Sequence, residues 1–379
     1  MSNKDRGVVL LSHGFQAEYE CGFANGLSRN GLDVTLIGSD VTLTNRLDPK
    51  IRFLNFRGSQ APNRPFLVKA ANLIVYWLRY SAYLLKHRGS TVHVFGLFSL
   101  PNLFASLCEA WLTKMVSGGY ILTVHNLMPH DRHNKVNAAL SRIIYKSAKA
   151  CIVHTQRMKD ELAAVYSINP ASIFILEHGI DRLYPRDNAT RVNTRARIGL
   201  SMDDKTLLFF GQIAPYKGLD LLLMAYDHVI KQYKVKLIIA GYCRDGSYRE
   251  WLKAEIDSRN DNGSILWMDC FVPDEDVVPL FIASDIFVMP YKHIDQSGVL
   301  FMALSTGLPL VVTDVGSLKD YISPGSIAVP PNSPYEFSAA IIELLGSMNK
   351  LNSETHNNLK KLLWINTVKS LLPLYRNNG

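Results

Sequence analysis

The fold is decided by residues 291–316, which read YKHIDQSGVLFMALSTGLPLVVTDVG. The apolar run Ile286–Met289 comes just before them and predicts a buried strand that ends at Pro290. Polar and small residues then predict a turn, residues 299–304 a short buried helix, and Leu310–Thr313 a second strand. A turn that leads into a helix N-terminus presents free backbone N–H groups and a positive dipole end, which suit a phosphate. An ordinary crossover between parallel strands, with no bound anion, has the same pattern.

The same alternation of strand-like and helical segments extends toward the N-terminus. Residues 206–210 read as a first strand of one such series and residues 8–11 as the first strand of another. This pattern predicts an α/β protein with two doubly wound, Rossmann-like domains. The polar stretch 184–200 interrupts the alternation and reads as a linker. We therefore assign residues 1–185 to the first domain, 186–356 to the second, and 357–379 to a closing helix that crosses back to the first.

Composition narrows the classes of function. The 379 residues are 47% hydrophobic, enough for two cores and too apolar for a disordered chain. Five scattered cysteines without a C-x-x-C pair argue for a reducing compartment, here the cytoplasm, and against a disulfide framework or a zinc site. The net charge is +8, and residues 1–182 hold 21 Lys and Arg against 12 Asp and Glu. Such a basic half suits phosphorylated ligands or an anionic membrane. Its dispersed charges and lack of a reader motif argue against nucleic acid.

One segment of the basic half is rich in apolar and aromatic residues. Residues 66–85 read FLVKAANLIVYWLRYSAYLL, and Pro65 before them suits a first helical turn. Lys69 and Arg79 interrupt the run, which makes it a poor transmembrane span. Two interpretations stay open: a helix buried on the sheet, or one that touches a membrane interface.

Polar residues at predicted strand ends are the candidate site residues of the first domain. Gly14 follows the first strand, and His125, His130 and Asp131 follow the strand near residue 122. Ligands of open α/β sheets bind at this edge. His125 can donate to a phosphate or orient a sugar hydroxyl, and His130 with Asp131 can act as an acid/base pair. A glycine turn and a polar loop that caps the next helix explain the same residues without a site.

The second domain has its own candidate after its first strand. Residues 211–218 read GQIAPYKG. Glycine allows the backbone to approach a ligand, and Lys217 supplies a point charge that suits a diphosphate. The alternative is an ordinary solvated lysine.

Several motifs in the second half resemble one known family. They are FFGQIAPYKG at residues 209–218, LIIAG at 237–241, FVPDED at 271–276, SDIFVMPY at 284–291 and ALSTGLPLVVTDVG at 303–316. In the first half Gly14, TVHN at 123–126 and HGID at 178–181 agree more weakly. The chain resembles the GT-B-fold nucleotide-sugar glycosyltransferases of family 4, a retaining group. That resemblance implies two Rossmann-like domains facing a central cleft.

The resemblance also implies roles for the candidate residues. The second domain is expected to hold the donor, with Lys217 on its diphosphate and Gln212 where the family has an arginine. The backbone of residues 296–299 is expected to add further contacts to the diphosphate. In the first domain Gly14 is expected to approach the donor and His125 to act in catalysis, while His130 and Asp131 contact the acceptor or the sugar. No cofactor and no metal are implied. The donor-contacting residues expected around the helix start are Gln296, Ser297, Gly298 and Val299.

One departure from the family pattern concerns its two glutamates, which stand eight residues apart. Counting back from Gly307 places them at Met302 and Ile294. Asp295 lies next to the first of these positions and is expected to replace that glutamate as a catalytic residue.

The function implied is transfer of a sugar from a nucleotide-diphosphate sugar, UDP favoured over GDP, to a hydroxyl of a lipid-linked or polysaccharide acceptor. We expect a role in exopolysaccharide or cell-surface glycan synthesis, in the cytoplasm and peripheral to the inner face of the membrane. Two alternatives remain: a catalytically silent GT-B partner subunit, which Met302 and Gln212 favour, or a GT-B sugar-nucleotide epimerase.

Overall fold

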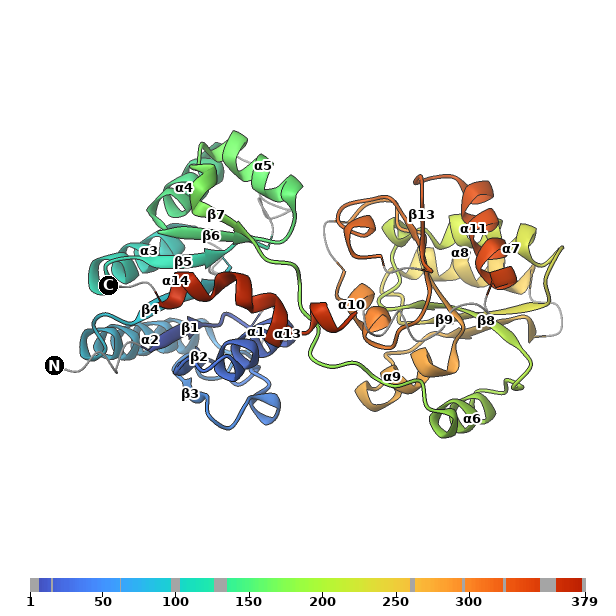
Figure 1. The fold of residues 1–379 in the computed structure, drawn as a ribbon, viewed down its shortest axis with the longest axis horizontal. Coiled ribbons are helices and arrows are strands. Elements are labelled where there is room, and N and C mark those ends of the chain that lie inside the picture. The colour runs from blue at the N-terminus through green and yellow to red at the C-terminus, as the bar shows by residue number, and fades with distance from the viewer. Residues whose placement is uncertain are drawn as a thin grey trace. The chain divides into compact units, whose positions relative to one another are not determined.

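The computed structural model describes residues 7–14, 16–61, 63–96, 103–125, 135–259, 263–294, 297–322, 325–347 and 359–376. The chain forms two compact units. Unit 1 combines residues 1–179 with 362–379, and unit 2 comprises residues 180–361. Each unit contains one fully parallel sheet with helices between its strands (Figure 1). The prediction of two doubly wound α/β domains is confirmed.

Unit 1 is built on a seven-stranded sheet of order β3-β2-β1-β4-β5-β6-β7. Its strands are β1 (Val8–Leu11), β2 (Val34–Gly38), β3 (Arg52–Asn55), β4 (Thr91–Phe95), β5 (Tyr120–Thr123), β6 (Ala150–Val153) and β7 (Ile173–Ile175). Its connecting helices are α1 (Ala17–Arg29), α2 (Phe66–Lys86), α3 (Leu103–Ser117), α4 (Lys135–Ser147) and α5 (Gln156–Tyr166). The strand order reverses between β1 and β4, and ligands of open sheets bind at such a switch point.

Alternate residues of each strand serve two different cores, because successive side chains of a strand point to opposite faces. Val9 and Leu11 belong to the core that holds Tyr76, Tyr80 and other side chains of α2 to α5. Val8 and Leu10 belong to the core on the opposite face, under α1 and the C-terminal segment. The strands are therefore apolar on both sides, which explains why they read as continuous apolar runs.

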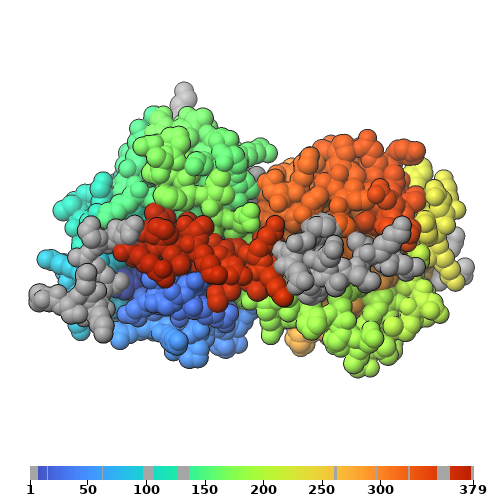
Figure 2. Space-filling model, viewed as in Figure 1, coloured from blue at the N-terminus to red at the C-terminus, as the bar shows by residue number. Residues whose placement is uncertain are grey.

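The C-terminal segment completes the second of these cores. It is helical from α13 (Trp364–Thr367) through a 3-10 turn (Val368–Leu371) to α14 (Leu372–Arg376). The tighter middle turn is consistent with Pro373, which has no N–H to donate back along the helix. Figure 1 shows α13 and α14 on the same side of the sheet as α1, and Figure 2 shows this segment (red) between the blue and green parts of unit 1. Residues distant in sequence thus share one core.

Unit 2 is built on a six-stranded sheet of order β10-β9-β8-β11-β12-β13. Its strands are β8 (Lys205–Phe210), β9 (Val235–Ala240), β10 (Ile265–Met268), β11 (Ile286–Met289), β12 (Leu310–Thr313) and β13 (Ile327–Val329). Its helices are α6 (Asn188–Arg197), α7 (Leu219–Val229), α8 (Gly246–Asp257), α9 (Asp274–Ala283), α10 (Gly298–Ser305) and α11 (Pro334–Ser347). The switch point here lies between β8 and β11. The strand, helix and strand predicted within residues 286–313 are confirmed.

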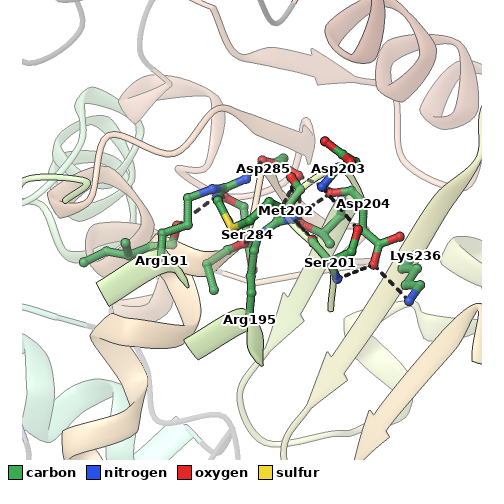
Figure 3. Close-up of polar contacts among 12 residues, drawn as sticks. Arg191, Arg195, Ser201, Met202, Asp203, Asp204, Lys236, Ser284 and Asp285 are labelled. Atoms are coloured by element: carbon green, nitrogen blue, oxygen red, sulfur yellow. Dashed lines mark hydrogen bonds and ion pairs between the residues drawn. The ribbon is translucent and has the colours of Figure 1, made fainter. Parts of the chain in front are cut away.

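The polar stretch that reads as a linker contains a helix. Asp187 caps α6, because its side chain accepts a hydrogen bond from Thr190 N. Arg191 and Arg195 then stand four residues apart and both bind Asp285, at the start of β11 (Figure 3). The stretch is polar because its arginines bind buried acceptors of unit 2 rather than water, and composition alone does not distinguish these two cases.

Candidate functional site

The turn after β8 needs glycine at two positions. Gly211 has φ +108° and Gly218 has φ +71°. A Cβ on Gly218 would lie 1.9 Å from Pro290 O, so no larger residue fits without moving the strand-end backbone. The turn is thereby held against the segment that follows β11. This close packing brings the two sides of the switch point together.

Lys217 is the charged group of this turn, and it is buried. Only 6% of the residue is exposed. Burial lowers the pKa of its amine to about 8. Its Nζ lies 5.3 Å from the ring centre of Tyr291, a cation–π contact. Within the described ranges, no hydrogen bond or ion pair satisfies this amine. A buried cation without a counter-ion is costly, which points to an anionic ligand.

The N-terminus of α10 lies beside this amine. A Cβ placed on Gly211 would be 3.1 Å from Lys217 Nζ and 3.3 Å from Val299 Cγ2, so both flank the same point. Ser297 is buried and its side chain does not cap the helix. The first N–H groups of α10 therefore have no side-chain acceptor from their own N-cap residue. An amine and a helix dipole that converge on one point form an anion site suited to a diphosphate.

The other sequence-predicted residues of this site have different surroundings. Gln212 is exposed, and Gly298 is exposed at the start of α10. Met302 is half-buried one turn into that helix and offers no charge. Asp295 and Gln296 lie outside the described residues. Lys217, Ser297 and Val299 are thus brought together, whereas Gln212 makes no described contact with them.

Unit 1 places its own candidates at the carboxyl edge of its sheet. Gly14 follows β1 with φ +75°, and a Cβ there would lie 2.5 Å from Val41 Cγ2. His125 follows β5. His130 and Asp131, expected beside it, lie outside the described residues.

His125 belongs to a group of buried and partly buried rings that the sequence analysis did not assemble. Its Nδ1 lies 3.1 Å from Nε2 of His154, which follows β6. The ring of Tyr19 on α1 packs edge-on against His125, His154, His178 and Trp364, at centroid distances of 4.7 to 5.2 Å. The position of His154 in the sequence could have revealed this contact. Residues that directly follow neighbouring parallel strands lie side by side, so His154 is expected next to His125.

The histidines of this group are neutral at neutral pH. Burial, followed by repulsion from His154 and His178, holds the pKa of His125 well below its usual range. Burial lowers the pKa of His154 to about 4 and, with His154, that of His178 to about 3. Neutral rings keep one bare nitrogen each, so they can accept as well as donate hydrogen bonds.

Metal-ligand clusters and membrane spans were also sought. In the described part of the chain, no three His, Cys, Asp or Glu side chains are placed to hold a metal ion together. The same ranges contain no helix both long and apolar enough to cross a bilayer.

Two family models match most of the chain. The model for glycosyl transferases group 1 matches residues 190–361, and that for glycosyltransferase family 4 matches residues 19–182. A glycosyltransferase of Methanocaldococcus jannaschii is 22% identical over 94% of this chain and 92% of its own length. Mannosylfructose-phosphate synthase of Agrobacterium fabrum is 28% identical over 49% of this chain and 42% of its own length. The match thus spans less than half of that second relative.

Solved structures resemble the whole chain. Sucrose-phosphate synthase from Thermosynechococcus elongatus has a TM-score of 0.72 at 16% identity and covers 98% of both chains. Anabaena HepE in complex with UDP has a TM-score of 0.69 at 14% identity, over 98% of this chain and 96% of that one. At such identities the likeness concerns the fold, and the family comes from the two sequence matches. The chain belongs to the GT-B-fold glycosyltransferases of the group 1, family 4 type.

Proposed function

We propose that this glycosyltransferase moves a sugar from a nucleotide-diphosphate sugar, UDP favoured over GDP, to a hydroxyl of a lipid-linked or polysaccharide acceptor. The observation that carries the donor part is the largely buried amine of Lys217, which has no hydrogen-bond or ion-pair partner among the described residues and lies beside the N-terminus of α10. We further propose that the anomeric configuration is retained and that the product serves cell-surface glycan synthesis. The proposed location is the cytoplasm, at the inner face of the membrane.

The proposed chemistry places the leaving diphosphate between Lys217 and the first turn of α10. As the bond from the anomeric carbon to the diphosphate oxygen breaks, negative charge grows on that oxygen. A fixed cation and oriented N–H groups stabilise the developing charge without reorganising at the moment of reaction. No metal or other cofactor is part of this proposal. Asp295 and the backbone of Gln296 remain proposed contributors, because the family resemblance assigns roles to their positions.

The donor site is tested by replacing Lys217 with a residue of similar length and no charge. We expect Lys217→Met to weaken UDP binding by about 1.5–3 kcal/mol, the worth of a hydrogen bond to a charged group. Lys253→Met, at an exposed position of α8, is the matched control and should bind as the wild type does. Calorimetric titration with UDP and GDP measures both. Equal affinity of the Lys217 variant and the wild type would remove the lysine from the site.

Turnover separates the enzyme from the silent subunit. Release of UDP or GDP from a panel of nucleotide sugars, with and without lipid-linked acceptors, should identify one productive donor. Binding without release for every donor and acceptor pair would favour the catalytically silent partner, in line with Met302 and Gln212 at the family's charged positions.

The membrane part of the proposal rests on the outer face of α2. Leu67, Ile74, Leu78 and Leu85 recur at helical spacing and are 78, 58, 67 and 48% exposed. The opposite side of the same helix, with Tyr76, Tyr80 and Leu84, is buried against the sheet. The helix is therefore apolar on two sides. The sequence left open whether this helix is buried on the sheet or touches a membrane interface. One side of it is part of the core, and the other side is exposed and open to a partner.

The charge around this face favours an anionic bilayer over a protein surface. Exposed apolar side chains continue onto α3, which packs beside α2, and include Trp111 and Met115. The exposed basic residues on α2, α3 and α4 are Lys69, Arg79, Lys86, Lys114, Arg142 and Lys146. The one acid of these three helices, Glu109, is buried. Exposed apolar side chains on helices whose exposed charged residues are all basic suit the boundary between acidic headgroups and acyl chains.

Flotation with vesicles tests this face. We expect the protein to float with vesicles of phosphatidylcholine and phosphatidylglycerol, and to do so less at high salt or with phosphatidylcholine alone. The double variant Ile74→Ser/Leu78→Ser should lose flotation. Phe271→Ser/Tyr335→Ser removes two exposed rings from unit 2 and should leave flotation unchanged. Dimerisation of the wild type without flotation would instead make a second copy the occupant of this face.

A further inference from the structure

A chain of hydrogen bonds connects a backbone carbonyl to His125. Leu176 O lies 3.0 Å from Nδ1 of His154, and Nε2 of His154 lies 3.1 Å from Nδ1 of His125. The three residues follow β7, β6 and β5, which are neighbours in the sheet. The order of the strands therefore builds the chain along the carboxyl edge. The donor and the acceptor of each hydrogen bond in this chain can be assigned in turn, starting from the carbonyl of Leu176.

The carbonyl sets the first direction because an oxygen of this kind can only accept. Nδ1 of His154 must carry the proton that it donates to Leu176 O. A neutral imidazole holds a single ring proton, so Nε2 of His154 is bare and accepts. Burial keeps His154 in this neutral form, with a pKa of about 4. The second contact then requires His125 to donate from Nδ1.

The same reasoning fixes the far nitrogen of His125. With its proton on Nδ1, the neutral ring leaves Nε2 bare. That Nε2 is buried and, among the described residues, has no hydrogen-bond partner. The opposite tautomer would set two lone pairs against each other between the rings and lose the bond to His154. A bare, buried acceptor that no described residue satisfies is suited to a ligand that brings a donor.

We propose that His154 is a positioning residue that holds His125 in the Nδ1–H tautomer, so that Nε2 of His125 accepts a hydrogen bond from a substrate hydroxyl. This inference rests on the proposed transfer between hydroxylated substrates. It decides between the two roles left open for His125: a bare Nε2 repels a phosphate oxygen and attracts a sugar O–H. The residue recognises a hydroxyl, and it cannot donate to a diphosphate in this tautomer.

The packing around His154 explains how one tautomer is held. Tyr19 lies edge-on to both rings, at centroid distances of 4.7 Å from His125 and 5.2 Å from His154. The two imidazoles themselves lie 5.1 Å apart at an interplanar angle of 24°. Tyr19 is itself 2% exposed on α1, so a fixed neighbour packs against both rings and restricts their rotation. The direction of the hydrogen bonds is therefore built into the fold before any substrate arrives.

Nitrogen NMR tests the tautomer without any need for turnover. Long-range proton–nitrogen spectra of the full chain, labelled with nitrogen-15, distinguish a protonated from a bare ring nitrogen. We expect His125 to show a protonated Nδ1 and a bare Nε2 between pH 6.5 and 8. In His154→Phe the bond partner is lost, and His125 should shift toward the Nε2–H tautomer. A protonated Nε2 of His125 in the wild type overturns the proposal.

Kinetics test the positioning role with two further variants. His154→Phe should lower kcat by roughly tenfold to a hundredfold, less than the loss of a direct acid–base group, because it acts through His125, and should leave UDP affinity unchanged. His154→Gln retains one acceptor and one donor on its amide, so it should restore both the His125 tautomer and most of kcat. His93→Phe removes another buried histidine of the same sheet, one without a hydrogen bond to His125, and should leave the tautomer as it is.

The outcomes separate this inference from the proposed function. A wild type with the expected tautomer but no transfer to any hydroxyl refutes the function and supports the hydrogen-bond chain. An unchanged tautomer and unchanged kcat in folded His154→Phe refute the inference and leave the function standing. Should His154→Phe fail to fold, His154→Gln and the wild-type spectrum still decide the tautomer.

Discussion

At the scale of single residues, burial explains why Lys217 is proposed to bind an anion. Lys217 keeps its amine in a largely buried site where no described carboxylate pairs with it, and burial lowers the pKa of the amine to about 8. An arriving diphosphate reverses this effect, since the opposite charge favours the protonated amine. In the proposed donor site, ligand binding is therefore coupled to the protonation of this one group.

This coupling predicts how donor affinity depends on pH. Above about pH 8 the free lysine loses its proton, and we expect the Kd for UDP to rise by up to roughly tenfold per pH unit. Lys217→Arg stays charged and should bind with the same affinity from pH 7 to 9, whatever that affinity is. Calorimetric titration at pH 7, 8 and 9 measures both proteins. A wild-type Kd that does not change over this range would contradict the role of Lys217.

A buried carboxyl gives a second prediction at this scale. Burial raises the pKa of Glu109 to about 8, although a hydrogen bond from Tyr76 opposes the shift. The folded state thus binds a proton that the unfolded state releases near pH 4.5. Stability contributed by the neutral group is complete below pH 4.5 and is lost as the pH rises to 8.

Glu109→Gln keeps the hydrogen-bond acceptor and removes the titration. We expect the variant to match the wild type near pH 5 and to exceed it at pH 8.5 by a few kcal/mol, on the order of the shift itself. Thermal unfolding across this pH range makes the comparison. A constant difference between the two proteins from pH 5 to 8.5 would show that Glu109 does not titrate in this window.

At the scale of elements, α6 shows how a polar segment becomes part of a core. Arg195 is fully buried, and its guanidinium donates to Ala283 O, Ser201 O and Asp204 O as well as to Asp285 (Figure 3). Asp285 also accepts from the backbone and side chain of Thr206 on β8. One carboxylate thus ties α6 to the starts of β8 and β11.

Removing this carboxylate's charge should destabilise unit 2. Asp285→Asn leaves Arg191 and Arg195 without a counter-ion, and we expect a loss of about 3–5 kcal/mol, as for a broken buried pair. Asp276→Asn breaks a more exposed ion pair, between Asp276 on α9 and Arg197 on α6. This change should cost less than about 1 kcal/mol. Urea unfolding measures the two variants. Equal losses would mean that burial does not decide the strength of these pairs.

At the scale of the whole molecule, the two ends of the chain build one unit. Trp364 packs so closely on Gly179 and Gly26 that a Cβ on Gly179 would lie 2.3 Å from its ring and one on Gly26 2.8 Å from its carbonyl. Val368 and Leu371 extend this contact into the core under α1. Tyr375 forms a hydrogen bond with the ring of His93 on β4. Unit 1 is complete only when the last helical segment has folded onto it.

Trp364→Ala should therefore loosen unit 1 selectively. We expect a loss of about 3–5 kcal/mol, as for other buried tryptophans, confined to the unit that contains its partners. Hydrogen exchange should speed up in α1 and β1 and stay the same in α7 and β8. Leu374→Ala, a partly buried neighbour in the same segment, should change these rates much less. Faster exchange in both units alike would contradict the assignment of this segment to unit 1.

The sequence by itself determined the architecture, and it singled out Lys217 as a candidate for binding the donor. Apolar runs with helices between them predict parallel sheets wherever they occur, because buried strands must be apolar on both faces. Lys217 could be identified because it lies in a glycine-containing turn directly after a strand, and such a turn is visible in a short stretch of sequence. Gln212 was expected to help it, yet it is exposed and makes no described contact with Lys217. The spacing of residues along the chain does not predict the direction in which a side chain such as Gln212 points.

Only the tertiary structure decided the surroundings of His125, the double face of α2 and the buried state of α6. His154, Tyr19 and Trp364 come from a strand end, a helix and the last segment of the chain, and they meet because the sheet order places them together. Likewise, whether Leu78 or Tyr80 of α2 faces the sheet depends on what packs against the helix. Local patterns set which elements form, whereas contacts between distant residues set burial, and burial sets the charge and tautomer on which the proposed chemistry depends.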